Sequence, residues 1–180
     1  MQKGYLVDIE SPEDRIEFVC FESFSEDVSI NYSAETIIGR SSPYQGYSDT
    51  GPRTFSLNLK ICASINYGEV HTFRGKSDYD YVAAVVDWLR SLVYPDYERY
   101  PGNISPHRVL FCFGSYIKSV CIVTSLSVSY PGPFDVDTWK PQVAEVDLGL
   151  TEVVKIPYSC YEVRAGKDRE ATAPSRTINR

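Results

Sequence analysis

The fold of this chain is decided by residues 108–153, which read RVLFCFGSYIKSVCIVTSLSVSYPGPFDVDTWKPQVAEVDLGLTEV. Arg108 to Phe113 is a short apolar run rich in aromatic and β-branched residues, which predicts a strand. Gly114-Ser115 follows, and a glycine at the first central position suits a two-residue type II′ hairpin turn. A return strand is then predicted over residues 116–130 and a third strand over residues 142–153.

The predicted strand at residues 116–130 is long. At roughly 3.3 Å per residue, its ~15 residues would span about 50 Å, more than a strand of a small domain usually covers. It therefore either bends at a bulge or projects beyond its own core. Its second half alternates between two faces. One face carries Ile122, Thr124, Leu126, Val128 and Tyr130, and the other carries Val123, Ser125, Ser127 and Ser129.

The predicted strand at residues 142–153 also has two faces. One is apolar, with Ala144, Val146, Leu148 and Leu150, and the other carries Val143, Glu145, Asp147, Gly149 and Thr151. Two interpretations of Glu145 and Asp147 stay open. They belong to a solvated sheet face, or they line the lumen of a ring, where acidic side chains would repel a passing polyanion.

Shorter strands are predicted upstream, at residues 5–9, 15–21, 27–32 and 53–62. Between them, the glycines and prolines from Glu35 to Arg53 predict a long loop, with room for a brief strand at residues 36–38. Its Tyr44 and Tyr47 suggest a partner contact as much as disorder. The strand at 53–62 alternates most cleanly and is expected to pair with residues 29–33 or with the strand near Gln142. Its core face carries Phe55, Leu57, Leu59 and Ile61, and its solvent face Thr54, Ser56, Asn58 and Lys60.

One helix is predicted, over residues 78–93. Ser77 is placed to cap its N-terminus, and Val82, Val85, Val86, Leu89 and Val93 recur at helical spacing. So wide an apolar stripe must pack against the sheet. Residues 162–180 are polar and lack periodicity, so they are predicted to be disordered when free, with the possibility of ordering against a neighbouring subunit.

Composition limits the classes of function. The chain has 180 residues, enough for one domain and a tail, and a net charge of −6, which argues against gripping nucleic acid by counterion release. Its five cysteines follow no CxxC spacing and lie mostly in apolar runs. They are interpreted as buried free thiols of a reducing cytoplasm and not as zinc ligands. No signal peptide or membrane-spanning run is apparent.

Catalytic patterns are weak. Asp49-Thr50-Gly51 matches the short signature of aspartic proteases, but the residues before it are not the apolar strand that would bury the aspartate. His71 and His107 cannot by themselves form a metal site of ordinary ligand count. Nucleophile-elbow and phosphate-binding glycine motifs are absent from the sequence. We therefore predict no enzyme activity, no catalytic residue, no cofactor and no metal.

Several segments resemble one protein family. In that family an apolar strand ends in a glycine turn, as at Phe113-Gly114, and a strand and loop of the type found at 121–135 follow. A proline and a further strand come next, as at Pro141 and residues 144–153. The upstream IIGRSSPYQGYSDTGPRTFSLNLKI is similar to the family's Gly-Arg loop and alternating strand. The chain thus resembles, over residues 27–155, the tail-tube-related baseplate and tube-initiator proteins of contractile-tailed bacteriophages and related injection machines.

The resemblance implies a fold and a role. The fold would be mainly β with one α-helix, an antiparallel β-sandwich or barrel of the tail-tube type with the helix at its side. A β domain at residues 1–160 would precede a polar tail at 161–180. Copies would form a hexameric ring that starts the tail tube or joins it to the baseplate hub, with DNA passing through without specific binding. The expected location is the virion, after assembly in the host cytoplasm.

The candidate surface residues follow from this hypothesis. The lumen or subunit interface is predicted to contain Glu145, Asp147, Ser125, Ser127, Ser129, Tyr44, Tyr47 and Arg40. The partners would be further copies of the chain and neighbouring tube and hub proteins, with no membrane. The alternative is a peripheral baseplate or fibre-attachment β-sandwich that binds protein or glycan through Tyr-rich loops, with Tyr97 and Tyr100 as the first candidates. An enzyme built on Asp49 ranks third.

Overall fold

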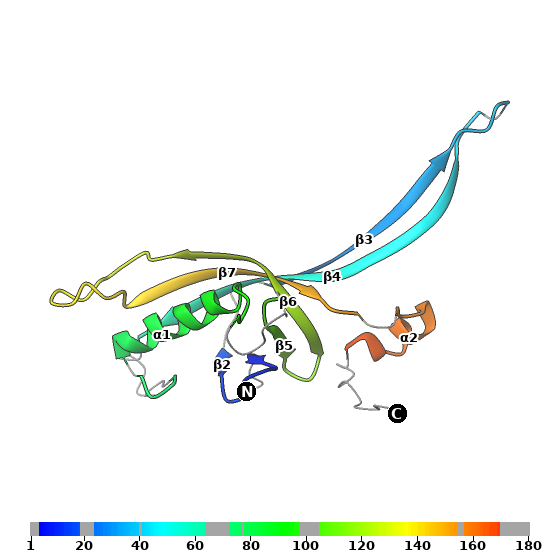
Figure 1. The fold of residues 1–180 in the computed structure, drawn as a ribbon. Helices are drawn as coiled ribbons and strands as arrows, with labels where there is room; N and C mark the ends of the chain where they lie inside the picture. Colours follow the sequence, from blue (N-terminus) through cyan, green and yellow to red (C-terminus); the bar gives the residue numbers. More distant parts are fainter. Residues whose placement is uncertain are drawn as a thin grey trace.

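The computed structural model describes residues 4–18, 24–39, 41–63, 73–76, 78–97, 105–154 and 157–169. Its strands form one antiparallel seven-stranded sheet in the order β2-β1-β5-β6-β7-β4-β3 (Figure 1). The prediction of a mainly β, antiparallel fold is confirmed, with a single hydrogen-bonded sheet. The elements are β1 (Gly4–Asp8), β2 (Arg15–Phe18), β3 (Phe24–Glu35), β4 (Tyr44–Cys62), α1 (Asp78–Ser91), β5 (Arg108–Phe113), β6 (Ile117–Ser129), β7 (Val143–Glu152), α2 (Cys160–Arg164) and the 3-10 helix η2 (Lys167–Arg169).

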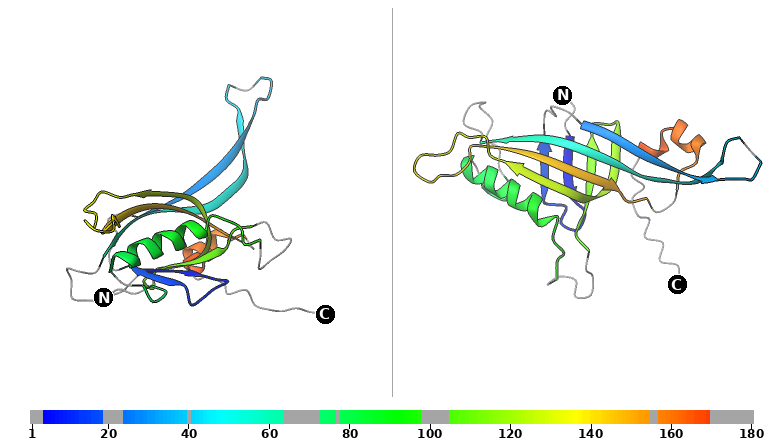
Figure 2. Two further views of the ribbon diagram at one scale, coloured as in Figure 1. Left: turned by 60° about the vertical axis from the view of Figure 1, so that its left-hand side comes forward. Right: turned by 90° about the horizontal axis from the view of Figure 1, so that it is seen from above.

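The sheet bends over itself into two layers around one core. The long strands β4 and β7 lie above β1, β2 and β5, and β6 runs from one layer to the other (Figures 1 and 2). Phe55 of β4 packs on Phe111 of β5, which is not its sheet neighbour, with ring centroids 5.3 Å apart. The alternation predicted for residues 54–62 and 143–152 is confirmed, because the inward side chains of both strands are buried.

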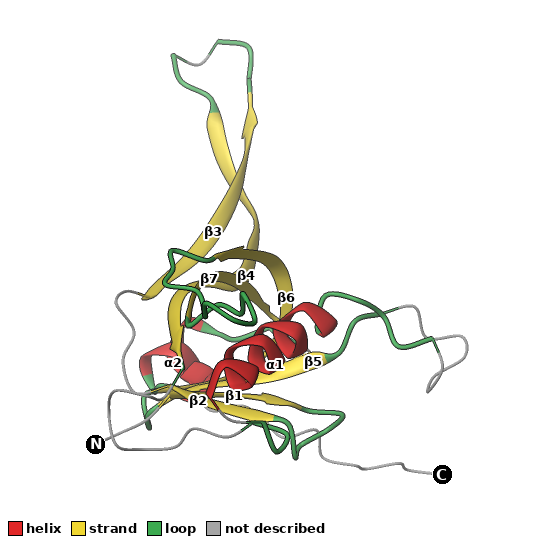
Figure 3. Cartoon of the chain, turned by 90° about the vertical axis from the view of Figure 1, so that its left-hand side faces the viewer, coloured by secondary structure: helices red, strands yellow, loops and turns green. Residues whose placement is uncertain are grey.

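Helix α1 lies between these layers, as Figure 3 shows from the side. Val82, Val85 and Leu89 are fully buried, and α1 packs against β6 and β7. Trp88 widens the contact by packing on Phe73, with ring centroids 5.6 Å apart. The predicted helix is therefore confirmed to within its last turn, while its predicted cap, Ser77, lies outside the described residues.

Strand β6 changes its inward face at a bulge. Val123 pairs with Leu150 and Ser125 with Gly149, so Thr124 is the extra residue. Before the bulge the odd-numbered side chains face the core, and after it the even-numbered ones do. The sequence prediction that placed Ile122 on the same face as Leu126 was wrong, because a bulge reverses the alternation beyond it.

The turn between β5 and β6 contains the predicted glycine but is one residue longer than predicted. Gly114 has a φ of 57°, as a type II′ turn requires. Phe113 pairs with Ile117, however, so three residues connect the strands instead of the predicted two.

Strand β4 extends far into the predicted loop. Its residues 54–62 pair with β7, whereas residues 44–53 pair with β3 and with no other described strand. Together with residues 28–35 they form a two-stranded ribbon that projects beyond the body (Figure 1). The loop prediction was wrong for residues 44–53. The register shifts twice there, and Gly51 and Pro52 fall within the first shift, where bulges tolerate such residues.

The chain beyond β7 is ordered farther than predicted. Ser159 caps α2 in a reciprocal arrangement with Glu162, and η2 follows with Asp168 buried. The expectation of disorder was wrong for residues 162–169, while residues 170–180 lie outside the described part. The division into a β domain and a tail stays a prediction.

Candidate functional site

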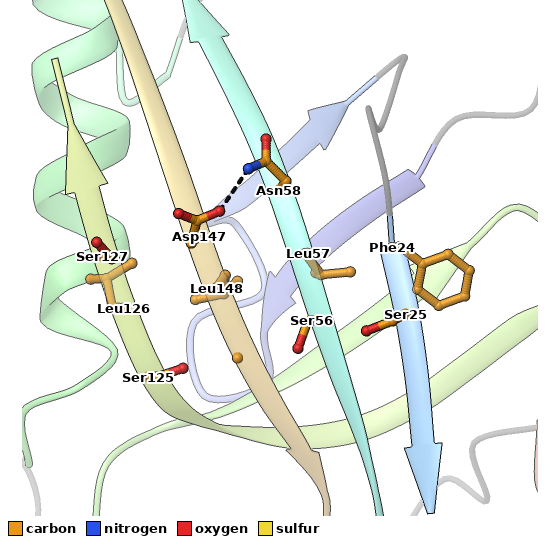
Figure 4. Close-up of a pocket in the computed structure, with 11 residues that line it drawn as sticks. Phe24, Ser25, Ser56, Leu57, Asn58, Ser125, Leu126, Ser127, Asp147 and Leu148 are labelled. Atoms are coloured by element: carbon orange, nitrogen blue, oxygen red, sulfur yellow. Dashed lines mark hydrogen bonds between the residues drawn. The ribbon is translucent and has the colours of Figure 1, made fainter. Parts of the chain in front are cut away.

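The outer surface of β6, β7, β4 and β3 carries hydroxyl groups in cross-strand rows. The first row contains Ser25, Ser56, Gly149 and Ser125, the second Asn58, Asp147 and Ser127, and the third Lys60, Glu145 and Ser129. We call these three rows the hydroxyl face. Figure 4 shows that the first two rows line a shallow depression. Five predicted residues, Ser125, Ser127, Ser129, Glu145 and Asp147, therefore lie together on one face.

The hydroxyl face is less acidic than the sequence suggested. Glu145 pairs with Lys60 at 3.4 Å, and Asp147 accepts a hydrogen bond of 2.6 Å from the Asn58 amide. One lysine and two carboxylates leave the three rows with a net charge of −1. The sequence could not reveal the pairing of Lys60 with Glu145, because it depends on the β4–β7 register.

Gly149 makes the floor of the depression. A Cβ built on it would lie 2.2 Å from the Ser125 Oγ. The missing side chain lets the Ser125 hydroxyl of β6 approach the sheet closely and leaves a hollow within the first row.

The ribbon presents an apolar face. Even-numbered residues of β3 share one side of the strand, and the Tyr32 ring meets the Tyr47 ring edge-on at 6.1 Å. Val28, Ile30, Tyr32 and Tyr47 are between 47% and 63% exposed, although the same side of β3 begins in the core at Phe24. We call these four residues the apolar ribbon face. An exposed apolar stripe continuous with a core is typical of an interaction surface.

Tyr44 and Tyr47, two of the predicted interface residues, thus lie on the ribbon. Tyr47 belongs to the apolar ribbon face and its hydroxyl lies 2.9 Å from Thr50 Oγ1. Tyr44 pairs with Glu35 at the outer end and is 54% exposed. Arg40 lies outside the described residues. The candidate residues therefore occupy two surfaces, the hydroxyl face and the ribbon.

A buried ionic cluster holds the base of the ribbon. The Arg53 guanidinium donates two 2.8 Å hydrogen bonds to the Glu152 carboxylate and further bonds to Glu26 and Asp168, both at 3.2 Å. Ser119 also donates to Glu152. The bond to Glu152 raises the pKa of Arg53 above its already high value, so the cation is retained. Sequence inspection missed this Arg53 cluster, since its members lie far apart in the chain.

The loop between β6 and β7 is the other projecting feature. Its apolar residues Phe134, Val136 and Trp139 are 43%, 87% and 78% exposed. Asp135 orders the loop, because its carboxylate accepts from the Thr138 N–H at 2.9 Å and its carbonyl accepts from the Trp139 N–H at 2.9 Å. Trp139 has a φ of 56°, a conformation that costs an ordinary residue about 1–3 kcal/mol. We call residues 130–142 the Trp loop.

No protein-family model matches the chain, and no curated protein matches it in sequence. The hydroxyl face and the apolar ribbon face are therefore identified from the geometry of the structure alone. Asp49, the candidate protease residue, lies on the exposed ribbon and accepts a 2.5 Å hydrogen bond from Asn31. His107 is bound to Asp8 at 2.8 Å, and His71 lies outside the described residues.

Two further observations concern the described residues only. They contain no group of three or more His, Cys, Asp or Glu side chains arranged to hold a metal ion. Among their helices, none combines the length and the apolar character that crossing a bilayer requires.

The cysteines differ in exposure, which predicts a difference in reactivity. Cys160 is exposed, contrary to the expectation of buried thiols, whereas Cys121 is buried and burial raises its pKa to about 12. At pH 8 only roughly one Cys121 in 10,000 is then a thiolate, the nucleophilic form. Brief iodoacetamide treatment of native protein is expected to modify Cys160 and spare Cys121, as measured by peptide mass spectrometry. A Cys160→Ser variant is the control, and equal labelling of both sites would contradict the prediction.

Proposed function

We propose that this protein is a structural subunit of a phage tail or baseplate. Copies form a ring, hexameric in the family that the sequence resembles, which initiates the tail tube or joins it to the baseplate hub. DNA passes through its lumen without specific binding. Neighbouring tube and hub proteins are its other partners, and the virion is its location.

The open edges of the strands β6-β7-β4-β3 carry this proposal. β3 ends the sheet, and among the described residues no strand pairs with its outer side. On the other side, β5 pairs with β6 only at residues 117–122, so among the described strands β7 alone pairs with residues 123–129 of β6. Unpaired edges are sites for association with another chain. Joining β3 of one copy to β6 of the next is a head-to-tail contact, and such contacts generate rings when the rotation closes.

The chemistry of the faces supports one orientation of the ring. The body of each subunit, with α1, β1, β2 and β5, lies on the core side of the long strands (Figure 3). A closed ring would therefore turn the hydroxyl face toward the lumen. Tight binding to DNA phosphates needs several unpaired cations. Lys60 is paired with Glu145, and the net charge of the face is slightly negative, which suits passage of a polyanion.

A single backbone N–H provides the test. The Val153 N–H donates to the Val120 carbonyl at 2.8 Å, so Val120 and Val153 form a hydrogen-bonded pair of the antiparallel β6–β7 ladder. Hydrogen-bonded and non-hydrogen-bonded pairs alternate along such a ladder. Beyond the bulge, the backbone N–H and C=O groups of Ser127 and Ser129 point toward their β7 partners, Asp147 and Glu145. The N–H of Val128 therefore points to the open edge.

Replacing Val128 by proline removes this outward donor and leaves the β7 pairing in place, since proline is tolerated on edge strands. The ring population is expected to fall by roughly tenfold or more, because each lateral interface loses about 0.5–1.5 kcal/mol and meets the proline ring. Light scattering after size exclusion and negative-stain electron microscopy measure the outcome. Val128→Thr, which keeps the N–H, should form rings. Wild-type protein that stays monomeric, or a proline variant that forms rings normally, would refute the proposal.

A further inference from the structure

The Trp loop and the ribbon lie at opposite ends of the layer that β6, β7, β4 and β3 form. β6 and β7 lead into the Trp loop at one end of the molecule, and β3 and β4 leave the body as the ribbon at the other (Figure 1). A second copy shifted along the strand direction would therefore bring its Trp loop to the ribbon of the first. Each of these two features exposes apolar side chains that no described residue covers.

The Trp loop combines apolar and acidic groups on an ordered turn. Val136 and Trp139 are the most exposed of its apolar side chains, and Asp137 beside them is exposed as well. The backbone bonds from Trp139 to Asp135 and from Asp135 to Lys140, both 2.9 Å, fix the turn. Lys140 also pairs with Asp80 of α1, which ties the loop to the body. A tryptophan held in place before binding is a typical anchor of a protein interface.

The ribbon offers the complementary combination. Val28 pairs with Arg53 across the ribbon and shares its face. Because Arg53 binds Asp168, η2 lies on the side of the sheet that the apolar ribbon face occupies. Figure 1 likewise places α2 below the ribbon. This segment exposes Arg164, Lys167 and Arg169, which we call the basic patch.

We propose that the Trp loop of one copy docks on the apolar ribbon face and basic patch of the next copy. Trp139 and Val136 cover the apolar side chains, and Asp137 lies near the cations. The contact joins two different surfaces of copies that are shifted along the strand direction, and repeating such a shift adds copies along an axis without closing. In the proposed function this contact would stack a further ring of the same subunit on the first, and the inference rests on that function for its biological meaning.

The contact is tested apart from ring formation in the Val128→Pro background, which removes the lateral edge. Sedimentation equilibrium then measures axial association of single subunits. Trp139→Ser is expected to weaken it by roughly tenfold or more, as loss of a central aromatic anchor does. Tyr94→Ser removes another aromatic residue, 71% exposed at the end of α1, and should leave association unchanged. Undiminished association of the Trp139→Ser protein, or no association of the parent, overturns the inference.

A charge exchange tests the registry of the contact. Asp137→Lys and Lys167→Glu should each weaken association several-fold, since each places like charges together. In the double variant, opposite charges meet again at every contact, with their signs exchanged, so most of the lost affinity should be recovered. If the loss of association free energy in the double variant equals the sum of the losses in the two single variants, the proposed pairing is overturned. Rings that fail to form in the wild type would refute only the proposed function, because these measurements need no ring.

Discussion

Replacing Arg53 by methionine is expected to lower the free energy of unfolding by about 3–5 kcal/mol. Arg53 and Glu152 are each 8% exposed, and the substitution leaves the Glu152 carboxylate buried without its cation. Asp168 loses its bond to the guanidinium at the same time, so residues 157–169 should be cleaved faster in limited proteolysis. Urea denaturation followed by circular dichroism measures the change in stability.

Two variants show whether this loss comes from the buried cluster. Arg90→Met removes a side chain that is half exposed and paired with Asp87 at 3.6 Å, and should cost at most about 1 kcal/mol. Arg53→Lys keeps the charge but not the planar fork that binds Glu152 through two nitrogens, and should give an intermediate loss. If Arg53→Met were no more destabilising than Arg90→Met, the cluster would not hold the ribbon base.

Replacing Phe111 by alanine is expected to destabilise the protein by about 3–5 kcal/mol. The Phe111 ring is fully buried and meets Phe55 of β4 at 5.3 Å and Phe24 of β3 at 6.4 Å. It therefore joins the lower layer of the sheet to the upper layer and to the first residue of the long hairpin. The midpoint of thermal or urea unfolding reports the loss.

Phe134→Ala is the matched control for Phe111→Ala. Phe134 is 43% exposed in the Trp loop, and its loss should change stability by no more than about 0.5 kcal/mol. A Phe111→Ala protein as stable as this control would mean that the two layers do not depend on the aromatic contact.

Alternation predicted the central strands well, because one buried face imposes a period of two. Residues 143–152 and 54–62 have the predicted inward side chains, and the serines of β6 join Glu145 and Asp147 on the opposite face. The prediction failed on β6 near Ile122. An inserted residue such as Thr124 has no distinctive composition, and only the register with β7 shows that the faces exchange there.

The ribbon and the chain beyond β7 were missed for different reasons. Gly46, Gly51 and Pro52 normally interrupt strands, yet here β3 supplies hydrogen bonds and the Tyr32–Tyr47 contact along the outer hairpin. Residues 160–169 carry no helical periodicity because a single buried group, Asp168, anchors them to Arg53. A pattern within a short window cannot report a partner 115 residues away.

The sequence separation within the Arg53 cluster affects when the subunit matures. Glu152 and Asp168 follow Arg53 by 99 and 115 residues. At 5–20 residues per second, the ribosome adds the last of these partners roughly 6–23 s after the arginine. Until Glu152 is added, Glu26 is the only carboxylate of the described cluster that Arg53 can bind. A nascent chain therefore lacks at least one of the carboxylates that hold the base of the ribbon until Asp168 has been added.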